Sequence, residues 1–250
     1  MKKKKKSKRR IEKRKRILKL LLFVLTLVLL YLFAFKTDFF NIRSIKVVGN
    51  KKLSYDQVIK ASMCNMGENI FKINRKKGKE SLERLPYIKD AKIKRNLPKE
   101  IIIEIDERKE IAIISYIGSF LYIDKEGNIL NIDEKKDKVE LPRIFGLELE
   151  ELEVGDNIYS TLEQGIEELI TYSEQLDLIK LMKYINFADN NNIMVELKDG
   201  IKVAFGPLNN VKYKLSFLNK ILNDIEKKDI KVKQILLNKG DNPIVVTEDS

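Results

Sequence analysis

Two pairs of acids are the groups in this sequence best suited to chemistry. Glu104 and Asp106 are two residues apart, as are Asp124 and Glu126, and paired carboxylates can act as general acid and base. On a strand, however, this spacing places both side chains on one face, here the polar and solvent-exposed one. Asp124 and Glu126 fall in a glycine-containing loop, where turn chemistry explains them. These acids therefore favour structural roles, and we assign no catalytic residue.

Histidine and cysteine restrict the chemistry further. The chain of 250 residues has no histidine and one cysteine, Cys64. This composition excludes Ser-His-Asp and Cys-His catalysis and removes the commonest metal ligand. A lone cysteine forms no internal disulfide, and we expect Cys64 to be a small buried apolar residue. We therefore predict no metal site and no cofactor.

The positive charge of the chain lies at one end. Residues 1–19 hold 13 of the 49 Lys and Arg residues and one acid, Glu12, a net charge of +12 that equals the charge of the whole chain. The rest of the chain is electrically balanced. A balanced body lacks the basic surface that nucleic-acid binding requires, so no nucleic-acid partner is expected.

An apolar segment follows this basic tail. Leu20 to Phe35 are uncharged, and residues 17–35 form about 28 Å of helix, enough to cross a bilayer core of roughly 30 Å. The excess of bases before the segment predicts a cytoplasmic tail over residues 1–16 and an extracytoplasmic body after it. A cleavable signal peptide is the alternative, but the segment lacks the small residues of a cleavage site.

Residues 39–108 have the pattern of a compact α+β unit. A strand around Ile45 is followed by a capping box at Ser54 and Gln57, which opens a helix. A second helix is expected over residues 79–85, ended by Pro86. Two strands, around residues 91–95 and 101–105, then complete a βααββ order, with the helices on one face of the sheet.

Residues 109–250 are expected to form a mixed α/β domain with an antiparallel, hairpin-rich sheet. Hairpins are predicted over residues 120–132 and 193–205, the second with an Asp199-Gly200 turn. Helices are predicted from residue 160 or 161 to about 182 and over residues 211–225. Residues 133–140 are expected to be exposed, residues 141–144 to be a short edge segment, and residues 234–237 and 244–247 to be strands.

A set of short motifs resembles one known family. The motifs are Phe39-Phe40-Asn41-Ile42, Val47-Val48-Gly49-Asn50, Gly67-Glu68-Asn69-Ile70-Phe71, Tyr87-Ile88-Lys89-Asp90-Ala91, Leu97-Pro98 and Glu107-Arg108. In this order, behind a basic tail and one apolar segment, they resemble the FtsQ/DivIB bacterial cell division proteins, and residues 39–108 resemble their POTRA domain. Residues 109–250 then correspond to the β domain of the family.

The resemblance implies a non-enzymatic, single-pass scaffold of the division machinery at the septum. It implies FtsL-like and FtsB/DivIC-like bitopic partners, the septal peptidoglycan synthase complex and the membrane. The alternative is a membrane-anchored extracytoplasmic cell-wall enzyme that uses the paired carboxylates.

The last strand is the candidate partner site. Ile244, Val245, Val246 and Thr247 form a β-branched run directly after Pro243, and proline favours an edge strand or its first position. No charge interrupts this run, so a partner segment can add to it as a further strand. The resemblance places FtsB/DivIC binding at this end of the chain, and Lys239 is included in the candidate site. The alternative is that Ile244 and Val246 pack inward and another strand covers the edge.

Two basic runs form a second candidate surface. Residues 75–77 and the bases at 92, 94 and 95 either bind an anionic wall polymer or lipid headgroup, or form a solvated loop and strand face.

Overall fold

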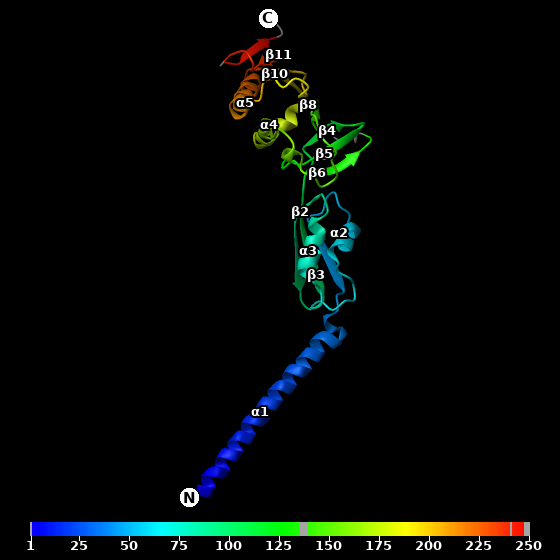
Figure 1. Cartoon of the computed structure of the whole chain (residues 1–250), viewed down its shortest axis with the longest axis vertical. Coiled ribbons are helices and arrows are strands. Elements are labelled where there is room, and N and C mark those ends of the chain that lie inside the picture. The colour runs from blue at the N-terminus through cyan, green and yellow to red at the C-terminus, as the bar shows by residue number, and fades with distance from the viewer. Residues whose placement is uncertain (1, 136–139, 241, 248–250) are drawn as a thin grey trace. The chain divides into compact units, whose positions relative to one another are not determined.

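The computed structural model describes residues 2–135, 140–240 and 242–247, which divide into two compact units (Figure 1). The first unit comprises residues up to Glu83 together with Asp90–Glu107, and the second comprises Arg84–Lys89 and the chain from Arg108 onward. Each unit is described by itself.

Helix α1 (Lys2–Lys36) opens the first unit. It contains the predicted apolar segment and continues through the basic tail. Within the described residues, Lys13–Lys36 are long and apolar enough to cross a membrane. This helix fits the expected membrane anchor. A short 3-10 helix, η1 (Asp38–Phe40), follows it.

The rest of the first unit has the predicted βααββ order, which confirms this part of the fold. Its elements are β1 (Ser44–Val48), α2 (Tyr55–Ser62), α3 (Arg75–Glu83), β2 (Ile88–Asn96) and β3 (Glu100–Glu107). In the described part of the chain the strands form a small sheet in the order β1-β3-β2, with β1 parallel to β3. Side chains at alternate positions, such as Ile45, Ile93 and Ile103, are buried, as expected for a sheet covered by helices on one face.

Local sequence explains the ends of these helices. The predicted capping box is present, because Ser54 accepts a hydrogen bond from Gln57 N and the Gln57 side chain accepts one from Ser54 N. The predicted bounds of the second helix, residues 79–85, are wrong. Helix α3 begins at Arg75 because Asn74 caps it, with Asn74 Oδ1 accepting from Lys77 N at 3.1 Å. Residues 75–77 therefore lie on a helix and not in a loop.

Glu107 joins the end of β3 to the loop before α2. Its carboxylate accepts hydrogen bonds from the backbone N–H groups of Lys51, Lys52 and Leu53 at 2.9, 2.7 and 2.9 Å. Three charge-assisted bonds to one carboxylate hold this loop in place. Cys64 is buried as expected, and burial raises the pKa of its thiol.

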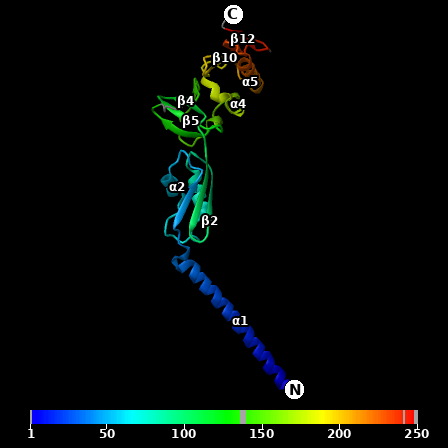
Figure 2. The same ribbon diagram turned by 180° about the vertical axis from the view of Figure 1, so that it is seen from behind.

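The second unit is built on a large sheet. Over the described residues its nine strands follow the order β12-β11-β10-β9-β8-β7-β4-β5-β6 (Figures 1 and 2). The strands are β4 (Ala112–Tyr116), β5 (Ser119–Ile123), β6 (Ile129–Asp133), β7 (Arg143–Phe145), β8 (Met182–Asn186), β9 (Ile193–Leu197), β10 (Lys202–Gly206), β11 (Val232–Leu236) and β12 (Ile244–Thr247).

The helices of this unit pack together on the sheet. They are η2 (Ile158–Ser160), α4 (Gln164–Gln175), η3 (Leu178–Leu181) and α5 (Val211–Lys228). The Tyr172 hydroxyl on α4 lies 3.2 Å from the Ser216 hydroxyl on α5. Ile166, Leu169 and Leu215 face a continuous apolar core that includes the inner side chains of the strands.

Two predictions for this unit are wrong. The helix expected to reach residue 182 ends at Gln175, because Asp177 adopts a left-handed backbone (φ +58°) and the chain then forms η3 and strand β8. The expected edge segment at residues 141–144 contributes β7, an interior strand parallel to both β4 and β8. The sheet is therefore mixed, because β7 pairs in parallel with a strand of each neighbouring antiparallel hairpin, β4–β5 on one side and β8–β9 on the other. The expectation for residues 133–140 falls partly outside the described residues, at 136–139.

A substitution at Gly78 tests how closely α3 packs against its neighbours. A Cβ atom at this position would lie 2.4 Å from the Ser62 carbonyl oxygen and 2.7 Å from Ile93 Cδ1. Gly78→Ala should therefore destabilise the first unit by about 1–3 kcal/mol through overpacking, although alanine favours helix by about 1 kcal/mol. Thermal unfolding followed by circular dichroism in micelles measures this loss. Lys77→Ala, one residue away and exposed, is the control and should leave the midpoint unchanged. A higher midpoint for Gly78→Ala would contradict the packing.

Candidate functional site

Three of the four acids considered for catalysis are engaged in structural contacts. Glu104 lies 2.6 Å from Lys94 Nζ across the small sheet, and Asp106 is exposed on the same strand. Asp124 is 3% exposed, and its Oδ1 accepts from the N–H groups of Glu126 and Asn128, each at 2.9 Å. Asp124 therefore shapes its turn, as the loop sequence predicts.

Arg108 joins this turn to the start of the second unit. Its guanidinium lies 2.6 Å from both the Asp124 and Glu126 carboxylates, and Lys89 also pairs with Glu126. Burial opposes the charge on Arg108, but the hydrogen bonds to the two acids raise its pKa overall. The hydrogen bonds from Lys89 and Arg108 hold the pKa of Glu126 below its usual value. A carboxyl group kept ionised in this way is a poor general acid.

The large sheet has two edges, and they differ. At the β6 edge, the loop over residues 153–158 makes backbone hydrogen bonds with Ile129, the first residue of β6, and with Gly127 just before it. Ile129 N donates to Asp156 O at 2.8 Å, Gly155 N donates to Ile129 O at 2.9 Å, and Ile158 N donates to Gly127 O at 2.9 Å. The chain therefore pairs with the start of this edge itself, at Ile129 and the turn before it.

The other edge is β12, where the described sheet order ends. This strand pairs antiparallel with β11, with Ile244 opposite Leu236 and Val245 opposite Ile235. Ile244 and Val245 are 47% and 39% exposed, and Val246 and Thr247 are half-buried. Edge strands in soluble proteins normally carry charge or cover, and Ile244–Thr247 contain no charged residue. Glu248 and Asp249, which follow in the sequence, lie outside the described residues.

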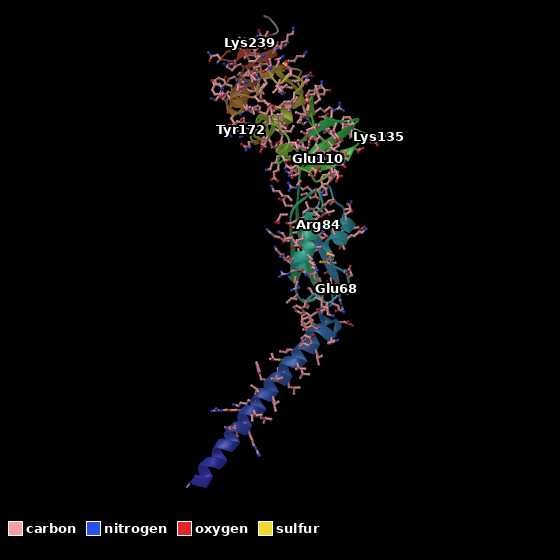
Figure 3. All side chains as sticks on the ribbon, in the orientation of Figure 1. Glu68, Arg84, Glu110, Lys135, Tyr172 and Lys239 are labelled. Atoms are coloured by element: carbon pink, nitrogen blue, oxygen red, sulfur yellow. The ribbon has the colours of Figure 1, made fainter. Side chains whose placement is uncertain are left out.

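The turn before β12 borders a pocket of about 600 Å³. Tyr213 and Phe217 on α5 line it, with ring centroids 4.7 Å apart, together with Gly240 and Pro243 from the turn. Lys239, in the same turn, is exposed at the C-terminal end of the unit (Figure 3). The structure thus places the five predicted site residues on one strand and its preceding turn. Sequence reasoning missed Tyr213 and Phe217, whose helical spacing resembles that of core positions.

Lys214 closes the inner side of this pocket. Its Nζ donates to Pro207 O at 2.7 Å and to Asn209 Oδ1 at 2.8 Å, and it lies 5.0 Å from the centre of the Phe205 ring. Burial lowers the pKa of this amine. The pocket is therefore a pre-formed feature held by polar contacts between α5 and the end of β10.

An apolar anchor helix, a βααββ unit and a second unit with an apolar sheet edge define a membrane-anchored, POTRA-type protein. Residues 40–108 match the family described as "POTRA domain, FtsQ-type", and residues 112–236 match "Cell division protein FtsQ/DivIB, C-terminal". The chain belongs to the FtsQ/DivIB family of cell division proteins, which confirms the resemblance seen in the sequence.

Individual relatives agree with this assignment. The chain is 32% identical over 229 residues to the cell division protein DivIB of Clostridium tetani, covering 86% of this chain and 83% of that protein. It is 32% identical over 156 residues to DivIB of Clostridium acetobutylicum, covering 62% and 58%. The solved major extracytoplasmic domain of DivIB from Geobacillus stearothermophilus matches with 14% identity and a TM-score of 0.31, over 49% of this chain and 97% of that chain.

Glu126 gives a pH-dependent test of the structural role of these acids. Glu126→Gln should lower the urea midpoint of unfolding at pH 7, because the ion pairs with Lys89 and Arg108 are lost. A depressed folded-state pKa gives stability that is present above the unfolded-state value of about 4.3 and is lost as the pH falls through the folded-state value. The difference from wild type should therefore shrink progressively as the pH falls below about 4. Asp106→Asn is the exposed control, and a difference independent of pH would contradict this account.

Proposed function

We propose that this chain is a non-enzymatic, bitopic scaffold of the bacterial division machinery at the septum. Residues 1–16 are cytoplasmic, residues 17–35 span the membrane, and the POTRA domain (39–108) and β domain (109–250) lie outside. Its partners are FtsL-like and FtsB/DivIC-like bitopic proteins, through which it helps control the septal peptidoglycan synthase. Family membership and the apolar anchor helix support this proposal.

The exposed edge of β12 is the observation that carries the partner site. A loop of the chain pairs with the start of the β6 edge, whereas Ile244 and Val245 at the other end of the sheet are apolar and exposed. A partner segment in extended conformation adds next to β12 and satisfies its backbone groups. Covering the two apolar side chains contributes the hydrophobic part of the binding free energy.

The pocket beside the turn supplies specificity. Tyr213 and Phe217 present aromatic surface next to Pro243, and aromatic residues are common at binding hot spots. A partner strand on β12 that continues past the turn places one apolar side chain in this pocket. Lys239 then pairs with an acidic residue of the partner at the rim.

The topology can be tested directly. A reporter enzyme that is active only outside the cytoplasm should be active when fused after Ser250, and inactive when fused before Lys2. N-terminal sequencing of the mature protein should recover the basic tail. A mature N-terminus beyond Phe35 would contradict the uncleaved anchor.

Val245→Pro tests strand addition at β12. Proline removes one backbone donor and disfavours pairing, so affinity for the DivIC-like partner should fall at least tenfold, which corresponds to about 1.4 kcal/mol. Val245→Thr keeps the N–H group and the β-branched shape and should bind as wild type does. Both variants should retain the thermal midpoint of the first unit. Undiminished binding by Val245→Pro, or by a chain that ends at Asn242, would refute the site.

A further inference from the structure

Aromatic side chains join the end of the anchor helix to the βααββ unit. The ring of Phe33 lies 5.3 Å from that of Phe39 and 5.7 Å from that of Phe40. The ring of Phe35 lies 5.8 Å from that of Phe71, which in turn lies 4.9 Å from Phe40. Phe71 therefore lies directly at the outer end of the apolar segment, where a bilayer meets water.

A hydrogen bond fixes the same junction. The Asn69 side chain is buried, and its Nδ2 donates to the Ala34 carbonyl in the last turn of α1 at 2.7 Å. This bond satisfies a carbonyl that a helix end leaves without an intrahelical partner. Asn69 Oδ1 accepts from Phe71 N at 3.0 Å. The loop that carries Phe71 is thus held against the end of the membrane segment.

A basic groove begins at this point. Arg95 donates from its Nη2 to the carbonyls of Phe71 and Ile73 at 3.2 and 2.8 Å. The groove lies between the start of α3 and the edge strand β2, has a volume of about 780 Å³, and is lined by Lys72, Ile73, Asn74, Arg75, Lys76, Lys79, Ala91, Lys92, Ile93, Lys94 and Arg95. These lining residues include seven bases and no acid.

The bases nearest the junction lack carboxylate partners. Lys79 pairs with Asp90, and Lys94 pairs with Glu104. By contrast, no ion pair between described residues involves Lys72, Arg75 or Arg95. Burial and the nearby charge of Arg75 lower the pKa of Arg95, so an anion in the groove would relieve unfavourable charge. The first turn of α3 adds the positive end of a helix dipole.

We propose that this basic groove binds the phosphate of an anionic phospholipid in the leaflet next to the body and so holds the βααββ unit against the membrane. Continuity with the membrane segment favours lipid over a soluble polymer, because Phe71 contacts both the ring of Phe35 and the guanidinium of Arg95. Phe39 and Leu97, 45% and 55% exposed, add apolar surface. Lys99 Nζ lies 5.4 Å from the centre of the Phe39 ring, which links the β2–β3 turn to this same end of the unit.

The test uses the full chain in nanodiscs of phosphatidylcholine alone or with one third phosphatidylglycerol. Amide hydrogen exchange over residues 72–79 and 91–95 should be at least threefold slower with phosphatidylglycerol at 50 mM salt. The protection should disappear at 0.5 M salt, because the attraction to headgroups is screened. Equal exchange in the two kinds of disc at low salt would overturn the proposal.

Matched charge variants separate the groove from general attraction. Lys72→Gln with Arg75→Gln should abolish the protection, whereas Lys46→Gln with Lys60→Gln, on β1 and α2, should retain it. Loss of protection in both double variants would overturn the groove as the site. Protection by soluble poly(glycerol phosphate) in phosphatidylcholine discs, without any by phosphatidylglycerol, would assign the groove to a wall polymer and overturn the lipid proposal. None of these outcomes depends on β12 or its partner.

Discussion

Unsatisfied backbone groups at the edges of an open sheet are the constraint on which the second unit depends. A sheet that does not close into a barrel must end twice, and each end presents N–H and C=O groups. Here residues 153–158 pair with the start of β6 through bonds to Ile129 and to Gly127 just before the strand. The β12 end is short and apolar, and neither charge nor proline interrupts Ile244–Thr247. One edge is paired at its start by the chain itself, and the other is suited to pairing with a second chain.

The adjacent acid and base of the Glu107-Arg108 motif both stabilise internal structure, one in each unit. Glu107 accepts three backbone N–H groups within the first unit, and Arg108 pairs with Asp124 and Glu126 within the second. Charges that resemble catalytic candidates in the sequence are therefore used to hold loops. The surfaces proposed for binding instead consist of a backbone edge, apolar side chains and exposed bases.

Much of this fold follows from local sequence. The apolar run of α1, the capping box of α2 and the 3.6-residue periodicity of α5 each predict their element, because the signal lies within one segment. The errors arise where tertiary contacts decide. Strand β7 has three residues and is held between β4 and β8, so periodicity cannot identify it as an interior strand. The end of α4 depends on a left-handed Asp177, which composition alone does not reveal.

The candidate sites also combine features that local sequence predicts with features that only tertiary contacts create. Pro243 and the β-branched run locate β12, but the pairing at the start of β6 comes from residues more than twenty positions away in the sequence. The basic groove needs Phe71, Arg95 and the end of α1 to meet, and no spacing rule predicts that.

The most direct measurement of the central claim is amide hydrogen exchange of Ile244–Val246 in the full chain, with and without the DivIC-like partner. Strand addition satisfies outward-facing backbone groups, so exchange at one or more of these amides should slow at least tenfold in the complex, while amides of β6 remain unchanged. A complex that forms with no protection anywhere along Ile244–Val246 would contradict the account.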